Sequence, residues 1–232
     1  MVQKGLVASR SQADSWIGLG KVTVDGRVAV KAGQFVHEQA DVKLTAKEQY
    51  VSRAGLKLAS VAELLKVDFT GKTVLDIGSS TGGFTDYALQ HGAAKVYAVD
   101  VGTEQLHPSL RGDERIELHE KTDIRDFSLE TAPDVVVMDV SFISLREILP
   151  HVATNLSDTK TQIVAMLKPQ FEAGRDQVNK GVIKNDAVRR QILRDFEAWS
   201  KRYFVILDKR DSEVKGQKGN AERFYLLKTT NR

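Results

Sequence analysis

The sequence predicts an α/β fold with a mainly parallel sheet, preceded by a small α+β module. Three features of its 232 residues indicate this architecture. From about residue 59 onward, short apolar runs alternate with segments of helical periodicity, as in sheets covered by helices on both faces. A glycine-rich turn, residues 78–83, follows the first of these runs. Residues 1–48 contain instead a short helical segment and an alternating hairpin pattern.

The N-terminal module is expected to begin with a short helix over residues 9–20, which starts with capping residues and stops at a glycine. Residues 22–30 alternate around Asp25-Gly26, which is a strong hairpin signal. This helix and basic hairpin resemble the RNA-binding module of ribosomal small-subunit protein four and of many pseudouridine synthases. The resemblance makes three residues candidate phosphate contacts: Arg10, Lys21 and Arg27.

That module normally starts with a further helical turn, so we expect an N-terminally shortened version over residues 1–48. Basic residues are concentrated here: residues 1–60 contain nine Lys or Arg and five Asp or Glu, whereas the rest of the chain is nearly balanced. A bias of this kind is expected of a part that contacts a polyanion. A solvated surface shows a similar excess, and a β-rich appendage without an RNA role is the alternative.

A linker over residues 49–58 is expected to join this module to a second domain, residues 59–232. It contains Arg53, a further candidate RNA contact, and it leads into a helix with apolar residues at helical spacing. Lys57 lies among the leucines of that helix. Its spacing alone predicts a solvated lysine on the face opposite the core.

The glycine turn and its flanks have the pattern of a nucleotide-binding half-fold. Residues 73–77 are expected to form a buried strand, residues 84–91 the helix that follows, and residues 93–100 the next strand. That second strand ends in Asp100. A carboxylate at this position accepts hydrogen bonds from ribose hydroxyls.

The glycine spacing argues against a diphosphate ligand. The chain has neither G-x-G-x-x-G nor the phosphate loop G-x-x-x-x-G-K-[ST] at this turn. Asp76, at the end of the first strand, would repel a diphosphate but could pair with an ammonium group. Together with Asp100 it predicts S-adenosyl-L-methionine as the cofactor. A dinucleotide site and a purely structural turn are the alternatives.

The rest of the chain continues the alternation of strands and helices. Strands are expected at 134–139, 161–168, 204–207 and 223–227, and helices at 145–153 and 186–203. Ligands bind outside the carboxyl ends of the strands in such sheets. Four polar residues lie at or just after predicted strand ends: Asp76, Asp100, Asp139 and Lys168.

The residue types near these strand ends limit the methyl acceptor. The chain has no cysteine, which excludes disulfides, thiolate metal sites and the usual nucleophile for carbon methylation of pyrimidines. Asp139-Val-Ser-Phe142 lacks the prolines of the Asn/Asp-Pro-Pro-Tyr motif of base N-methyltransferases. An oxygen acceptor remains, most simply a ribose 2′-hydroxyl, whose proton a base such as Lys168 must remove. A purely structural salt bridge between Lys168 and Asp139 is an equally good interpretation.

Five ordered motifs together resemble the TlyA family, also called haemolysin A, which has an FtsJ-like ribosomal RNA methyltransferase domain. They cover residues 50–58, 76–85, 137–144, 167–172 and 219–222. The resemblance implies a Rossmann-like S-adenosylmethionine-dependent methyltransferase with a mainly parallel seven-stranded sheet. It also implies 2′-O-methylation of ribose in ribosomal RNA, often at cytidine, with ribosomal RNA or ribosomal subunits as partners. A cytoplasmic location is the default expectation for a sequence without cysteine or a recognisable secretory signal.

The same resemblance assigns the site residues. The family's catalytic tetrad falls on Lys57, Asp139, Lys168 and Glu222, so Lys57 supports the acceptor instead of being solvated, and Lys168 is the base. No metal is implied. The family's cofactor contacts fall on seven positions: Asp76, Gly78, Ser79, Gly82, Phe84, Asp100 and Asp123.

Two other functions are weighed against this one. The family's second name suggests a membrane-active haemolysin, but no apolar run approaches membrane-spanning length, and residues 186–203 have few large apolar side chains on one face. No secretory signal is recognisable at the start of the sequence. A non-catalytic RNA-binding protein would be expected to have lost part of the tetrad, and all four residues are present.

Overall fold

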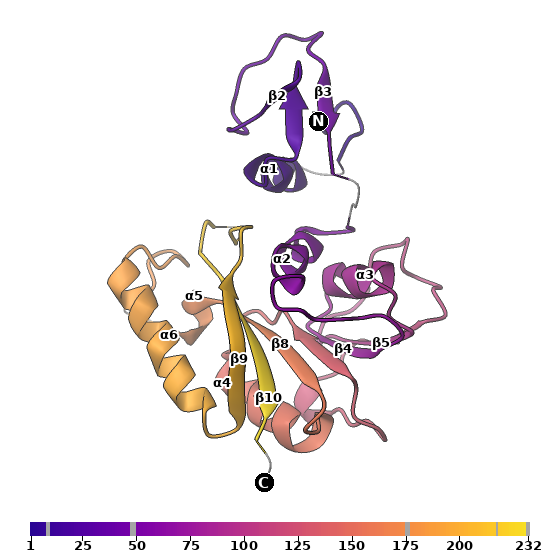
Figure 1. The fold of residues 1–232 in the computed structure, drawn as a ribbon, viewed down its shortest axis with the longest axis vertical. Helices are drawn as coiled ribbons and strands as arrows, with labels where there is room; N and C mark the ends of the chain where they lie inside the picture. Colours follow the sequence, from indigo (N-terminus) through magenta and orange to yellow (C-terminus); the bar gives the residue numbers. More distant parts are fainter. Residues whose placement is uncertain (8–9, 47–49, 175–176, 217, 231–232) are drawn as a thin grey trace.

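The computed structural model describes residues 1–7, 10–46, 50–174, 177–216 and 218–230 of the chain. A small three-stranded sheet with helix α1 forms the N-terminal module, and a seven-stranded sheet flanked by helices forms the larger part (Figure 1). This arrangement confirms the predicted α/β fold preceded by a small α+β module.

The N-terminal module contains α1 and three antiparallel strands in the order β2-β1-β3. Asp25 and Gly26 have positive φ angles of 49° and 79°, as expected for the predicted two-residue hairpin turn. The predicted helix and hairpin are therefore confirmed, whereas β3 was not predicted. The elements α1, β1, β2 and β3 span Arg10–Gly18, Val22–Val24, Arg27–Val28 and Val42–Leu44.

Helix α2 (Arg53–Ala62) lies between this module and the large sheet. Gln12 of α1 donates from Nε2 to the carbonyl oxygen of Tyr50 at 3.0 Å, and Trp16 belongs to the same buried apolar cluster as Leu56 of α2. Because α2 begins at residue 53, the last part of the segment expected to be a linker is helical. The domain boundaries stay predictions.

Helix α2 packs closely on α3 (Gly83–Gln90), and a glycine makes this approach possible. A Cβ atom on Gly55 would lie 2.5 Å from Cβ of Tyr50 and 2.9 Å from the carbonyl oxygen of Gly83. Real side chains do not reach such short distances, so any larger residue here would push α2 away from α3. The contact fixes the helix that carries Lys57.

The large sheet has the order β6-β5-β4-β7-β8-β10-β9. Neighbouring strands are parallel from β6 to β8, whereas β10 is antiparallel to both β8 and β9. All the predicted strands are present, and β6 is an additional one. The strands β4 to β10 span Thr73–Ile77, Lys95–Val99, Ile116–His119, Val135–Met138, Gln162–Leu167, Phe204–Asp211 and Arg223–Thr229.

Helices cover both faces of this sheet. Successive strand residues point to opposite faces, so neighbouring residues of one strand pack against different helices. Val74 and Val137 join the apolar cluster that includes α2 and α3, whereas Leu75 and Val136 join the cluster that includes α4 and α6. The remaining helical elements are a 3₁₀ turn at Ile124–Asp126, α4 at Leu145–His151, a π turn at Val152–Leu156, α5 at Pro169–Glu172 and α6 at Asp186–Ser200.

No helix within the described ranges combines the length and the apolar character that crossing a bilayer would need.

Candidate active site

The polar residues predicted from strand ends converge at one edge of the sheet. Asp100, Asp139 and Lys168 directly follow β5, β7 and β8, and Asp76 is the next-to-last residue of β4. These strands are parallel neighbours, so their carboxyl ends meet. The predicted convergence is therefore confirmed.

Glu222 reaches the same edge from the opposite direction. It precedes β10, and the antiparallel register pairs Arg223 of β10 with Leu167 of β8. Continuing this register by one residue brings Glu222 beside Lys168. Because β10 runs antiparallel to β8, the residue that precedes β10 lies at the same edge as the carboxyl ends of the parallel strands.

Two lysine–carboxylate pairs occupy this edge. Nζ of Lys57 lies 2.6 Å from Oε2 of Glu222, and Nζ of Lys168 lies 2.6 Å from Oδ1 of Asp139. The four side chains are 2% to 14% exposed. Burial raises the pKa of Glu222, while Lys57 counteracts this and the charges of Asp139 and Lys168 act on it in opposite senses. The four residues named by the resemblance thus form one electrostatic cluster.

The buried position of Lys57 overturns the interpretation drawn from its spacing. Lys57 lies on α2 between two fully buried leucines, Leu56 and Leu58, yet its ammonium reaches Glu222 instead of solvent. Helical spacing identifies a lysine in an apolar segment but says nothing about a carboxylate supplied by a strand far along the chain. The solvated lysine predicted from spacing is wrong.

Two cavities adjoin at this edge. The larger has a volume of about 510 Å³, and the smaller about 120 Å³. Residues that line the larger one include Gly78, Asp100 and Asp123. Residues that line the smaller one include Asp76, Ser79, Phe84 and Lys168. Gly78, Ser80, Asp139 and Ser141 contribute to both walls.

Gly78 brings the backbone after β4 against the backbone after β7. Its φ angle is 79°, and a Cβ atom there would lie 3.0 Å from the carbonyl oxygen of Asp139. Gly82, with φ of 85°, caps the start of α3 and does not contribute to the walls of either cavity. Among the predicted cofactor contacts, Gly82 therefore has an indirect place, as the residue that starts α3.

Asp76 is a fully buried carboxylate in the wall of the smaller cavity. Its Oδ2 accepts a hydrogen bond from Oγ1 of Thr85 at 2.7 Å, whereas its Oδ1 has no hydrogen-bond partner among the described residues. Burial raises the pKa of Asp76 to about 7, against the opposing effect of Thr85 and with a further increase from Asp139. Oγ of Ser79, in the same wall, also has no partner within the described ranges.

Asp100 and Asp123 stand in the wall of the larger cavity. The two oxygens of Asp100 accept hydrogen bonds from the backbone N–H groups of Ser80 and Gly102, at 2.8 and 2.7 Å. Asp123 caps the 3₁₀ turn and pairs with Arg125 at 2.6 Å, and hydrogen bonds from Arg125 lower the pKa of Asp123 to about 2. Both carboxylates are therefore oriented, and each keeps lone pairs for a further donor.

Several site residues were not predicted as individuals. Nζ of Lys168 donates to Oγ of Ser141 at 2.6 Å. Phe142 has a φ angle of 66° and is 92% exposed, and its ring lies 5.2 Å from that of Phe171. Both Ser141 and Phe142 lie in the motif at 137–144, so the signal was present in the sequence without a role attached.

The predicted RNA contacts fall into two groups. Arg10, Lys21 and Arg27 are exposed on the N-terminal module. Arg53, at the start of α2, is partly buried and donates from Nη2 to the carbonyl oxygen of Lys215 at 2.5 Å. Arg53 therefore also ties α2 to the loop between β9 and β10.

Comparison with known proteins matches both parts of the chain. Residues 50–229 match the model of the FtsJ-like methyltransferase family, and residues 1–42 match that of the S4 domain. A 23S rRNA (cytidine-2′-O)-methyltransferase TlyA from Campylobacter jejuni is 44% identical, over 77% of this chain and 70% of that protein. A 16S/23S rRNA (cytidine-2′-O)-methyltransferase TlyA from Mycobacterium tuberculosis is 37% identical, over 99% of this chain and 88% of that protein.

A solved structure agrees over the same extent. The protein, from Streptococcus thermophilus and named as a hemolysin, is 38% identical to this chain and superimposes with a TM-score of 0.76. The alignment covers 99% of this chain and 86% of that one. The name of one relative thus refers to lysis, and the names of others refer to RNA methylation.

Proposed function

The chain belongs to the TlyA family of FtsJ-like methyltransferases, and we propose that it methylates a ribose 2′-hydroxyl of a cytidine in ribosomal RNA, with S-adenosyl-L-methionine as donor. One observation carries the proposal. Two lysine–carboxylate pairs adjoin a cavity that is also lined by the buried carboxylate of Asp76, and no cation of the described residues pairs with Asp76. One end of the site is equipped for a hydroxyl acceptor and the other for a positively charged ligand.

The cavities suit the parts of this cofactor. Asp76, with a free Oδ1 in the smaller cavity, would hold the ammonium of the amino-acid end, and Ser79 would add a hydrogen bond. Asp100 would accept from the ribose hydroxyls in the larger cavity, with Asp123 beside the base. When bound, the cofactor supplies a methyl group carried on a positively charged sulfonium. The protein contributes orientation and exclusion of water.

The acceptor chemistry falls to the buried tetrad. We assign the neutral amine form of Lys168 to accept the proton of the 2′-hydroxyl, becoming an ammonium beside Asp139, from a position fixed by Asp139 and Ser141. Lys57 and Glu222 would hold the ribose from the other side of Lys168.

Phe142 supports a nucleic-acid acceptor. An aromatic side chain that is 92% exposed, at the wall of the larger cavity, offers a flat face on which a nucleobase can stack. Its left-handed backbone conformation is unusual for a bulky residue, and such conformations concentrate at functional sites.

The N-terminal module would bind RNA and deliver it to this site. The exposed cations Arg10, Lys21 and Arg27, with Arg53 at the junction, would contact phosphates. We propose the division into residues 1–48, 49–58 and 59–232 on this basis, with ribosomal RNA or ribosomal subunits as the cytoplasmic partner. RNA binding should weaken steeply as salt rises, because phosphate contacts release counterions.

Radiolabelled methyl transfer tests the proposal. Purified protein is incubated with unmodified ribosomal subunits, and in parallel with bare ribosomal RNA, and the labelled nucleotide is then mapped. We expect label on the 2′-oxygen of a cytidine. No incorporation into any RNA, together with lysis of cells by the same protein, would instead favour the membrane-active function.

A further inference from the structure

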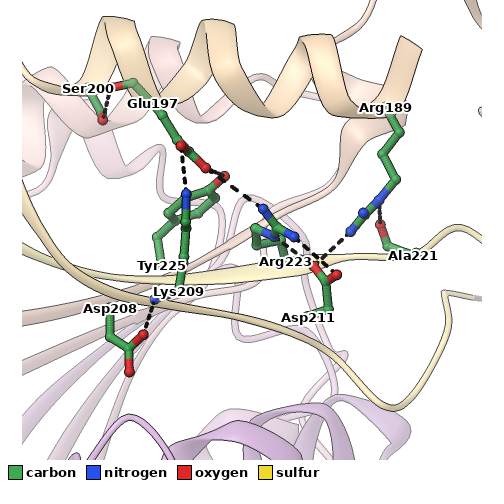
Figure 2. Close-up of polar contacts among 9 residues, drawn as sticks. All are labelled: Arg189, Glu197, Ser200, Asp208, Lys209, Asp211, Ala221, Arg223 and Tyr225. Atoms are coloured by element: carbon green, nitrogen blue, oxygen red, sulfur yellow. Dashed lines mark hydrogen bonds and ion pairs between the residues drawn. The ribbon is translucent and has the colours of Figure 1, made fainter. Parts of the chain in front are cut away.

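Charged side chains contact the residues on either side of Glu222, and they lie on the face of the sheet opposite to Lys57. Strand side chains alternate between faces, so Glu222 points toward Lys57 while its neighbours Ala221 and Arg223 present their groups elsewhere. Figure 2 shows a cluster of charged residues from α6, β9 and β10 around those two neighbours. The carboxylate of the site is thus one residue away from this second cluster.

Arg189 of α6 makes two contacts in this cluster. Its Nε donates to the carbonyl oxygen of Ala221 at 3.1 Å, and its Nη2 lies 2.8 Å from Oδ1 of Asp211 (Figure 2). The side chain of Arg189 is only 16% exposed. One guanidinium therefore connects a helix to the peptide bond that immediately precedes Glu222.

Asp211 joins Arg189 to the residue on the other side of Glu222. It is the register partner of Arg223, which donates from Nε to Oδ1 at 2.7 Å and from Nη2 to Oδ2 at 3.1 Å. Burial acts to raise the pKa of Asp211, but hydrogen bonds from Arg223 and Arg189 outweigh it and lower that pKa. Arg189, Asp211 and Arg223 thus form a clamp, here called the α6 clamp.

Asn220, two residues before Glu222, is also held by hydrogen bonds. It is 4% exposed, and its amide accepts from the backbone N–H of Ile183 at 3.0 Å and donates to the carbonyl oxygen of Gly181 at 2.8 Å. Residues 220, 221 and 223 are therefore all held by other segments. The backbone of Glu222 is restricted in position, because planar peptide bonds connect it to these neighbours.

The carboxylate of Glu222 is closely surrounded and has little room to move. A Cβ atom on Gly216 would lie 2.7 Å from Oε1 of Glu222, so the loop between β9 and β10 passes directly over it. A small shift of the backbone at residue 222 would break the 2.6 Å contact with Lys57 or force the carboxylate into this loop. The position of the Glu222 side chain therefore depends on the contacts that hold residues 221 and 223.

We propose that Arg189 is a positioning residue of the methyl-transfer site, acting through Ala221 and Asp211 to hold Glu222 against Lys57. The proposal rests on the function proposed above. Helix α6 contributes no side chain to the walls of the two cavities. In this proposal it affects methyl transfer through the position of Glu222. A clamp with a merely structural role would affect the stability of the sheet edge and leave turnover by the folded protein unchanged.

The test compares Arg189→Ala with Arg190→Ala. Arg190 is the next residue of the same helix and is exposed, so the control removes the same charge at nearly the same place. We expect Arg189→Ala to lower kcat about 10- to 100-fold, since small misplacements of site groups can cost this much, and to leave cofactor affinity within about twofold. Arg189→Lys should restore part of kcat, because a lysine can still donate to one of the two acceptors.

A second readout needs no turnover. In the ligand-free protein, the carboxyl carbon of Glu222 is titrated by NMR and assigned with Glu222→Gln. Lys57 opposes the increase in the pKa of Glu222 that burial causes, so loosening their contact should raise this pKa further in Arg189→Ala. Arg190→Ala should titrate as the wild type does.

The outcomes separate this inference from the proposed function. If Arg189→Ala does not fold, Asp211→Asn, which keeps the shape of the side chain, takes its place and should show the same loss of kcat. A wild-type kcat and an unchanged Glu222 titration in a folded variant would overturn the positioning role. A wild-type protein that methylates no RNA would overturn the proposed function itself, whereas the titration would still report on the clamp.

Discussion

The two ends of the candidate site differ in how their carboxylates are balanced. At the acceptor end, Asp139 and Glu222 each contact a lysine ammonium at 2.6 Å. At the donor end, Asp76 is just as buried, but its Oδ1 has no partner among the described residues and its pKa is raised to about 7 by burial. A buried carboxylate without a cation is costly. Under the proposed function, a positively charged ligand would complete the surroundings of Asp76, whereas Lys57 and Lys168 already neutralise Glu222 and Asp139.

The largest expected effect comes from breaking the acceptor end. Lys168→Ala should lower kcat at least 100-fold, because general-base catalysis contributes about 10²- to 10⁴-fold. Cofactor affinity, measured by calorimetry, should stay close to that of the wild type. Lys201→Ala, an exposed lysine after α6, is the matched control. A Lys168→Ala protein that still turns over normally would remove the base assignment.

The second largest effect is expected from protonation of Asp76, which should weaken cofactor binding at low pH. An ionised Asp76 binds an ammonium group well and a protonated one does not, so wild-type cofactor affinity should fall about tenfold for each pH unit below about 7. Asp76→Asn should bind weakly at every pH and show no such slope. Calorimetry across this pH range checks both. The same slope in Asp76→Asn would assign the pH dependence to another group.

The same carboxyl group should have the opposite influence on folding. In the ligand-free protein the raised pKa of Asp76 favours the protonated form, so its contribution to stability is full below pH 3.8 and is lost as pH rises through about 7. Urea unfolding should therefore show a larger loss of stability over this range in the wild type than in Asp76→Asn. Parallel curves for the two proteins would contradict the raised pKa.

A smaller effect is expected at the ribose contact. Asp100→Ala should weaken cofactor binding about tenfold, the value of one or two hydrogen bonds to a charged group, and change kcat little at saturating cofactor. Asp208→Ala, at the far edge strand β9, provides the control. Calorimetric affinity equal to that of the wild type would show that Asp100 serves only the backbone of Ser80 and Gly102.

The smallest effect is expected at the mouth of the site. Phe142→Ala should raise the KM for RNA roughly threefold to tenfold through loss of base stacking, while cofactor affinity stays unchanged. Phe142→Trp should keep the wild-type KM, and Phe142→Leu should not, because leucine is apolar but has no aromatic face. Equal KM values for the Trp and Leu variants would show that Phe142 makes an apolar contact with RNA and that base stacking is not needed.

Much of the fold could be predicted because its signals are local. Apolar runs, a glycine turn and Asp25-Gly26 each specify structure over a few residues, and their alternation predicts a mainly parallel sheet. The strand order, with β10 between β8 and β9, was not predicted. β6 was missed because its residues 116–119 are half-buried or exposed and lack a continuous apolar run. β3 was missed for a similar reason.

The site was only partly predictable because its contacts are distant in sequence. Asp76, Asp100, Asp139 and Lys168 could be grouped from strand ends alone. Lys57 could not, since its partner lies at the start of β10, and the resemblance supplied it instead. The contact of Arg189 with Ala221 left no pattern in the sequence, because a peptide carbonyl can be contributed by any residue.

The antiparallel insertion of β10 has a consequence for the order of folding. β10 lies between β8 and β9 although it follows both in the chain, so β8 and β9 are separated by a gap that residues 223–229 must fill. Glu222 and its contact with Lys57 form only when that gap closes. The glycine turn depends on residues close to it in the chain and can therefore form before this contact.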